Sequence, residues 1–259
     1  MKKMFVTEGL RKIYRLLLSE QKRSYIYRKY RYLPEAPSVE HVFATYARRK
    51  KNCFFVQIGA NDGISNDPLF VYANAFRWRG LLVEPVKYIF EDLVANYRNN
   101  PRIIFENKAI GTENGWRDFF YFPPTDAAIP KWYRGLGSFY TDVIFKHRYA
   151  IPNIEDYLVQ EKVETITLDC LLKKYNVEHV DIVHSDTEGF DSEIIRMLDF
   201  ERLQPDLILF EHKHLAKRDY EDCLSLLAAK NFCFFFDYQD TLCFHRERVS
   251  YLSKGHYKY

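Results

Sequence analysis

The run Phe54-Phe55-Val56-Gln57-Ile58-Gly59-Ala60-Asn61-Asp62-Gly63, followed by Leu82-Val83-Glu84-Pro85, decides the fold of this chain. Its first half is apolar without alternation, as expected for a central parallel strand covered on both faces. Gly59 and Gly63 allow a tight turn in which the backbone approaches a ligand closely. Asn66 or Asp67 is expected to cap the following helix. Glu84 then ends the next strand, where a carboxylate can accept hydrogen bonds from ribose hydroxyls, so the segment predicts a nucleoside-cofactor site.

The spacing of the two glycines bears on which cofactor this is. A dinucleotide site normally carries G-x-G-x-x-G, because the pyrophosphate needs backbone on two sides. Here the spacing is G-x-x-x-G, and the loop contains Asn61 and Asp62. A carboxylate repels a pyrophosphate but attracts an amino group, so the loop favours S-adenosylmethionine over NAD. The plainer interpretation is an ordinary strand-turn-helix whose glycines serve only the turn.

Composition indicates one α/β domain with additions, since the chain has 259 residues of which 47% are hydrophobic. The cysteines number five and include no C-x-x-C pair. This usage is typical of reduced thiols in an intracellular protein, and neither of a disulfide framework nor of a zinc site. No apolar run of roughly 7–15 residues follows the first lysines, so neither a secretory signal nor a membrane span is predicted. A cytoplasmic location is therefore expected.

Charge is concentrated at the start of the chain. Residues 1–51 hold 14 Lys and Arg against 4 acidic residues, a balance of +10, whereas the remainder sums to −7. Apolar residues recur at helical spacing in this part, which indicates a basic helical extension. Residues 1–31 could meet an anionic membrane at its inner face or an anionic glycan, or the helix could simply pack on the domain. Nucleic-acid binding is not expected, because no recognised motif accompanies the charge.

Strands and helices alternate along the remaining chain except in residues 111–160, and the last strand runs in the reverse direction. In residues 111–160 a strand is predicted at 117–122, followed by a long loop at 123–139. Such a segment is more often a lid or binding loop than filler, although a satellite hydrophobic cluster is an equal alternative. Residues 232–238 and 242–246 form a predicted hairpin, so the final strand runs antiparallel to the others. A hairpin at this place favours a methyltransferase over a dinucleotide fold.

Five motifs in this order resemble the FkbM family of S-adenosylmethionine-dependent methyltransferases, many of which act on sugar hydroxyls in glycans, glycolipids or natural products. They are residues 58–63, 82–85, 107–111, 185–191 and 205–212. The resemblance covers roughly 52–247, with 1–51 as an extension and 248–259 as a C-terminal tail. It implies an α/β, Rossmann-like class I methyltransferase fold. Its mostly parallel seven-stranded sheet is closed by an antiparallel hairpin, and the cofactor lies at the carboxyl ends of the strands.

The resemblance also implies the cofactor residues. Glu84 and Asn107 are expected to hold the ribose and adenine, and Asp186 to line both the cofactor and acceptor sites. The full cofactor set comprises Gln57, Gly59, Ala60, Asn61, Asp62, Gly63, Asp67, Glu84, Pro85, Asn107, Ala109 and Asp186. Two positions depart from the family pattern. Gln57 stands where members often have an acidic residue, and His184 stands where they often have lysine.

The hydroxyl that receives the methyl group must lose its proton. Residues at the carboxyl ends of the last two parallel strands are expected to remove it. His212 is the expected base, because an imidazole titrates near neutral pH, with Asp186 and Glu211 as further catalytic groups. These three side chains could instead hold Mg²⁺, but a single histidine and scattered spacing do not favour a metal. The same two strand ends also offer Glu188 and His214. The plainer interpretation of His214 is a surface residue near Lys213 and Lys217, and that of Glu188 is a cap that complements the dipole of the next helix.

The sequence therefore predicts an O-methyltransferase that acts on a sugar or glycan hydroxyl. Two alternatives remain open. One is an NAD-dependent sugar oxidoreductase or epimerase, which the missing third glycine disfavours. The other is a membrane-surface adaptor with a degenerate methyltransferase fold, which the intact Gly59, Gly63 and Glu84 disfavour.

Overall fold

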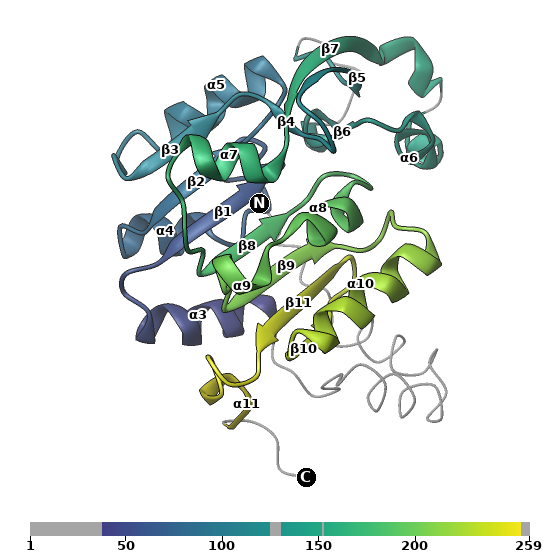
Figure 1. Cartoon of the computed structure of the whole chain (residues 1–259). Coiled ribbons are helices and arrows are strands. Elements are labelled where there is room, and N and C mark those ends of the chain that lie inside the picture. Colours follow the sequence, from purple (N-terminus) through teal and green to yellow (C-terminus); the bar gives the residue numbers. More distant parts are fainter. Residues whose placement is uncertain (1–37, 125–130, 152, 255–259) are drawn as a thin grey trace.

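The computed structural model describes residues 38–124, 131–151 and 153–254 (Figure 1). The membrane contact predicted for residues 1–31 lies outside these ranges, as does the end of the C-terminal tail. Within the described ranges, no helix combines the length and the apolar content needed to cross a membrane.

A seven-stranded sheet forms the centre of the molecule, in the order β10-β11-β9-β8-β1-β2-β3. Its strands are β1 (Phe54–Ile58), β2 (Arg79–Val83), β3 (Ile103–Glu106), β8 (Ile182–Ser185), β9 (Leu207–Glu211), β10 (Phe232–Phe236) and β11 (Asp240–His245). The pairs from β3 to β9 are parallel, whereas β11 runs antiparallel to both β9 and β10. The predicted α/β fold with a closing antiparallel hairpin is confirmed.

Helices cover both faces of this sheet (Figure 1). Four of them pack on one face, namely α7 (Leu168–Lys174), α8 (Asp191–Met197), α9 (Phe200–Leu203) and α10 (Lys217–Ala229). The opposite face is covered by α3 (Val39–Arg49), α4 (Phe70–Ala75), α5 (Lys87–Asn96) and α11 (Tyr251–Lys254). In β1, Val56 faces the first layer and Phe55 the second, and both are at most 1% exposed. This double coverage is why the strand is apolar without alternation.

Helix α3 belongs to the part of the predicted extension nearest the domain. Ser38 caps it by accepting a bond from the His41 backbone N–H, and Phe43 and Tyr46 on one of its faces are fully buried. The Tyr46 hydroxyl donates to Asp206 Oδ2 at 2.8 Å, at the start of β9. Residues 38–49 therefore pack on the sheet, whereas the helix predicted from the apolar spacing of residues 10–18 lies outside the described residues.

A second, four-stranded sheet is inserted after β3. Its strands are β4 (Ala109–Ile110), β5 (Gly115–Tyr121), β6 (Gly137–Ser138) and β7 (Val159–Ile166), in the order β4-β7-β5-β6. The prediction of one long loop at 123–139 is wrong for the described residues. Residues 131–135 form a 3₁₀ helix, η1, and residues 137–138 form β6. Helix α6 (Thr141–Phe145) and the 3₁₀ helices η2 (Lys146–Tyr149) and η3 (Ile154–Tyr157) follow.

Burial explains why this inserted segment has structure of its own. Phe122, Tyr133, Ile144 and Ile154 meet in a separate hydrophobic cluster, and each is at most 1% exposed. Sequence periodicity does not reveal these contacts, because the elements that carry them are only two to five residues long. The segment is thus a satellite cluster placed beside the carboxyl ends of the main sheet (Figure 1).

Candidate functional site

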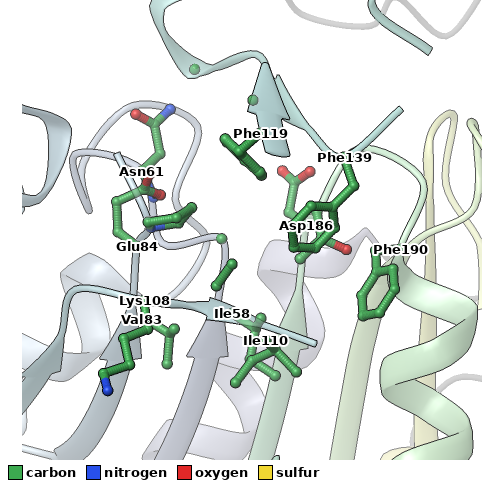
Figure 2. Close-up of a pocket in the computed structure, with 16 residues that line it drawn as sticks. Ile58, Asn61, Val83, Glu84, Lys108, Ile110, Phe119, Phe139, Asp186 and Phe190 are labelled. Atoms are coloured by element: carbon green, nitrogen blue, oxygen red, sulfur yellow. The ribbon is translucent and has the colours of Figure 1, made fainter. Parts of the chain in front are cut away.

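A cavity lies where the main sheet meets the inserted sheet (Figure 2). The main sheet contributes Ile58, Val83, Glu84 and Asp186 from the carboxyl ends of β1, β2 and β8. The inserted sheet and the segment after it contribute Ile110, Phe119, Gly137 and Phe139. Figure 2 shows Glu84 and Asn61 on one side of the cavity and Asp186, Phe139 and Phe190 on the other. Ligands of open α/β sheets bind at this edge.

The 59–63 loop holds its shape through backbone contacts. The N–H groups of Gly59 and Ala60 both donate to the Val83 carbonyl at 3.0 Å, and the Asp186 N–H donates to the Ile58 carbonyl. Gly59 has φ of +74°, and a Cβ atom there would lie 1.9 Å from the carbonyl oxygen of Asp186. Glycine is therefore required, because the β8 loop passes directly against it.

Glu84 is the buried carboxylate of the cavity, at 6% exposure. Its Oε2 accepts from the Asn61 N–H and its Oε1 from the Val86 N–H, both at 3.0 Å. Burial raises the pKa of Glu84 to about 7, against the lowering effect of these two bonds. Asn107 does not line the cavity. Its amide donates to the carbonyls of Glu84 and Pro85 at 2.8 and 3.0 Å, so it fixes the strand end that carries the carboxylate.

Half of the predicted cofactor residues line the cavity, namely Gly59, Asn61, Glu84, Pro85, Ala109 and Asp186. The other predicted residues do not line it, namely Gln57, Ala60, Asp62, Gly63, Asp67 and Asn107. Gln57 Nε2 donates to Asp67 Oδ2 at 3.0 Å, and Gln57 Oε1 has no hydrogen-bond partner among the described residues.

The carboxylates of the loop region are used to order backbone. Asp67 Oδ1 accepts from the N–H groups of Leu69 and Phe70. The N-cap of α4 is Leu69, however, so the prediction that Asn66 or Asp67 caps this helix is wrong in position. Burial raises the pKa of Asp67 to about 6. Asp62 Oδ1 accepts from the N–H groups of Ile64 and Ser65. Both aspartates therefore shape the loop without lining the cavity.

A second group of polar side chains borders the cavity at Asp186. We call it the histidine–carboxylate cluster, and it consists of His147, Asp186, Glu188, Glu211 and His214. Potential ligand atoms of Asp186, Glu188 and Glu211 lie within 4.8 Å of one another, as do those of His147, Glu188 and His214. His214 Nε2 lies 3.0 Å from Glu188 Oε2 and 3.8 Å from Glu211 Oε1.

Crowding of carboxylates changes their protonation. Asp186 faces the cavity, yet loss of hydration among the surrounding groups, followed by the charges of Glu188 and Asp191, raises its pKa well above the ordinary value. Burial and then the charges of Glu188 and Asp186 raise the pKa of Glu211 likewise. Asp191 is kept in place by the Ser185 and Thr187 hydroxyls, which donate to it at 2.5 and 2.9 Å.

His212 does not belong to this cluster. Glu211 and His212 are successive residues at the end of β9, so their side chains leave on opposite sides of the sheet. The His212 ring stacks on Tyr220 of α10 at 4.9 Å between centroids, and its Nδ1 lies 3.0 Å from Thr241 Oγ1. Burial lowers its pKa to about 4. The structure thus places the predicted base away from the cavity lining.

His214 and His147 occupy the place expected for His212. His214 is 7% exposed, so its plainer interpretation as a surface residue is wrong. Its ring centroid lies 5.8 Å from that of His147, which comes from η2 and is 4% exposed. Burial, and then the charge of Lys213, lowers the pKa of His147. His147 was not predicted as a site residue, because the four residues of η2 show no recognisable helical pattern in the sequence. The only signal in the sequence is the aromatic and basic residues around His147.

The sequence model of the Methyltransferase FkbM domain matches residues 57–234. A search of curated proteins found no match.

Several solved structures match this chain at low similarity. The FkbM methyltransferase from Methylobacillus flagellatus KT is 12% identical with a TM-score of 0.45, over 81% of this chain and 48% of that one. The METTL16 methyltransferase domain is 12% identical with a TM-score of 0.43, over 79% and 64%. A fibrillarin/Nop5p complex gives 13% identity and a TM-score of 0.39, over 80% and 79%. This chain therefore spans about half the length of the FkbM structure.

Proposed function

The chain belongs to the FkbM methyltransferase family, and we propose that it transfers the methyl group of S-adenosylmethionine to a hydroxyl of a sugar or glycan. The family match confirms the predicted membership of the FkbM family and, with it, the class of S-adenosylmethionine-dependent methyltransferases. The observation that carries the finer proposal is one cavity bordered by Glu84 on the cofactor side and by Asp186 with the cluster on the other.

The residues present fit S-adenosylmethionine better than a dinucleotide. Ile58, Val83 and Ile110 provide an apolar wall, and Glu84 offers a carboxylate to ribose hydroxyls. Among the described residues that line the cavity, Lys108 is the sole cation, and it is paired with Glu164. A pyrophosphate would have no free cation there. When bound, the cofactor supplies a methyl group already activated by its sulfonium.

A sugar acceptor suits the groups on the far side of the cavity. Asp186, Glu188 and Glu211 can accept hydrogen bonds from several hydroxyls. Trp132 exposes 50% of its surface nearby, with its ring 5.8 Å from that of His147. Carboxylates beside an exposed aromatic ring suit an acceptor that has both hydroxyls and an apolar face.

The chain must also take the proton of the acceptor hydroxyl. Asp186 is the carboxylate of the cluster that lines the cavity itself. It lies at the cavity wall, and the surroundings that raise its pKa, loss of hydration and then the neighbouring carboxylates, increase its affinity for a proton. We therefore assign proton removal to Asp186, with Glu211 behind it.

Methyl transfer from radiolabelled S-adenosylmethionine tests the proposal. The full chain would be offered nucleotide sugars, free oligosaccharides, lipid-linked glycans, proteins and small amines in separate reactions. We expect label in a sugar fraction, with a new methoxy signal by NMR, and none with Glu84→Ala. Label that enters only amines or proteins would contradict sugar O-methylation.

The basic extension carries a separate proposal, in which residues 1–31 bind an anionic membrane surface. Deleting residues 1–30 should then abolish co-sedimentation with anionic liposomes and leave cofactor binding unchanged. Sedimentation of the full chain should weaken with added salt, because screening acts beyond about 8–10 Å near physiological ionic strength. Failure of the full chain to sediment at low salt would contradict membrane binding.

A further inference from the structure

The histidine–carboxylate cluster contains an unusual number of buried polar atoms without a partner. Within the described residues, both ring nitrogens of His147 and of His214 form no hydrogen bond. The same holds for Glu188 Oε2 and Glu211 Oε2. Two of these six atoms, His214 Nε2 and Glu188 Oε2, form an ion pair at 3.0 Å, which leaves four without a partner. A buried polar atom without a partner costs about 1–3 kcal/mol, so four such atoms in one place call for a ligand.

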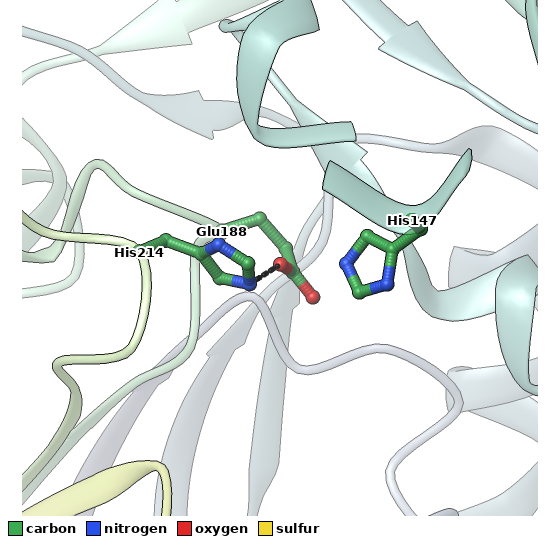
Figure 3. Close-up of side chains that lie close together, drawn as sticks. All are labelled: His147, Glu188 and His214. Atoms are coloured by element: carbon green, nitrogen blue, oxygen red, sulfur yellow. Dashed lines mark ion pairs between the residues drawn. The ribbon is translucent and has the colours of Figure 1, made fainter. Parts of the chain in front are cut away.

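These atoms are directed toward one another. In Figure 3 the Glu188 carboxylate lies between the two imidazole rings, with His214 on one side and His147 on the other. Glu188 Oε2 is 3.0 Å from His214 Nε2, without the alignment of a hydrogen bond. The described Lys and Arg side chains form no ion pair with Asp186, Glu188 or Glu211. The basic groups nearest to these carboxylates are therefore imidazoles, while Lys213 acts on Asp186 through its charge without an ion pair.

The backbone around Glu188 holds it in this position. Glu188 has φ of +50°, a conformation that is uncommon for residues other than glycine, and Gly189 follows with φ of +103°. The Ser138 hydroxyl of β6 donates to the Glu188 carbonyl at 2.8 Å. Strain of this kind persists only where the surrounding structure imposes it, and it is enriched at functional sites.

We propose that His147, Glu188 and His214 bind a divalent transition-metal ion of the Zn²⁺ type, beside the acceptor end of the cavity. Two imidazoles and a carboxylate form a known ligand set for catalytic zinc, which keeps a further position open. Nitrogen ligands favour such an ion over Mg²⁺ or Ca²⁺, which prefer oxygen. This differs from the Mg²⁺ alternative of the sequence analysis, because His212 lies elsewhere.

The distances suit such an ion after small side-chain movements. Zinc bonds of about 2.0–2.2 Å in a tetrahedron place ligand atoms roughly 3.4 Å apart. The potential ligand atoms of the three side chains already lie within 4.8 Å of one another, with one pair at 3.0 Å, so side-chain rotations that shift these atoms by about 1 Å close the site. Glu211 and Asp186 remain as neighbouring carboxylates that can orient a bound hydroxyl.

The catalytic role proposed for the ion rests on the proposed function, methyl transfer to a hydroxyl. A hydroxyl at the open position would become more acidic, and Asp186 at the cavity wall would accept its proton. Binding of the ion is independent of the acceptor, so it can be measured without knowing the substrate.

The test uses the untagged full chain after treatment with a chelator. Calorimetry with ZnCl₂ should show one site per chain, and MgCl₂ should bind at least a hundredfold more weakly. His147→Ala, His214→Gln and Glu188→Gln should each weaken zinc binding at least tenfold. His179→Ala is the matched control, since His179 contacts Asp181 in the opposite part of the sheet and should leave zinc binding unchanged.

Titration with S-adenosylhomocysteine checks that each variant keeps its cofactor cavity. Variants that bind this ligand normally but lose zinc support the site. Absence of a zinc site in the wild type, or zinc binding that all three variants retain, would overturn it whatever the transfer assay gives. Cluster-dependent zinc binding without sugar methylation would instead keep the metal site and reject the proposed function.

Discussion

The 59–63 loop and the histidine–carboxylate cluster border the same cavity, but their polar groups find partners in different ways. The carboxylates of the loop region, Asp62 and Asp67, accept backbone N–H groups within a few residues of themselves. In the cluster, His147 and His214 come from segments far apart in the chain and have unpartnered ring nitrogens. A region with satisfied polar groups provides a fixed shape, whereas unsatisfied groups provide chemistry.

The largest effect should follow from disturbing the fixed shape. In Gly59→Ala the new Cβ would lie 1.9 Å from the Asp186 carbonyl oxygen, so the loop and the β8 end cannot both keep their positions. We expect the free energy of unfolding to fall by about 4 kcal/mol or more. Urea denaturation measures it.

Gly115→Ala is the matched control for that substitution. Gly115 also has a positive φ, +154°, but no heavy atom lies within 4 Å of its Cβ position. Backbone strain alone should cost about 1–2 kcal/mol. Equal losses in the two variants would show that close approach of the β8 loop does not constrain Gly59.

The next largest effect should come from the cluster, on rate and not on stability. Asp186→Asn should lower kcat by about 10²–10⁴, because it removes the carboxylate that faces the acceptor. His212→Ala should change kcat less than about tenfold, since that ring packs on Tyr220. Initial rates, measured with the acceptor that the methyl-transfer assay identifies, decide between Asp186 and His212. A His212 variant that loses as much activity as Asp186→Asn while binding cofactor normally would return the base to His212.

A smaller effect concerns the pH dependence of stability at Glu84. Burial raises its pKa to about 7, whereas an unfolded glutamate titrates near about 4.3. Between these values the folded protein binds more protons than the unfolded chain. Its stability relative to Glu84→Gln should therefore fall as pH rises through this window, by on the order of 2–3 kcal/mol. Unfolding free energies measured from pH 4 to pH 8 without cofactor test this, and parallel curves would contradict it.

Sequence could predict the loop side of the cavity because its information is local. An apolar strand, two glycines and Glu84 lie within 31 residues, so their spacing already implies the turn and the strand end. The cluster depends on contacts between residues 147, 188, 211 and 214, which no spacing reveals. His214 is buried because it packs beside His147 of the inserted segment, and neighbouring lysines conceal this in the sequence.

Side chains alternate between the two faces of a strand, so being at the end of β9 does not by itself place a side chain at the cavity. β9 ends at Glu211, so Glu211 and His212 must face opposite sides. Gln57 shows the same limit, because its position at the end of β1 suggested the cavity while its amide binds Asp67. The fold and the place of the site follow from pattern, whereas the facing of single side chains requires tertiary structure.

Binding of S-adenosylhomocysteine measured by calorimetry tests the central claim most directly. The wild type should bind it and should not bind NAD. Glu84→Ala should weaken binding at least about tenfold, because charge-assisted bonds are worth about 1.5–3 kcal/mol each. Glu201→Ala, which removes an exposed carboxylate paired with Lys230, should leave affinity unchanged. Unchanged affinity in Glu84→Ala, or binding of NAD in place of S-adenosylhomocysteine, would contradict the assignment of this cavity.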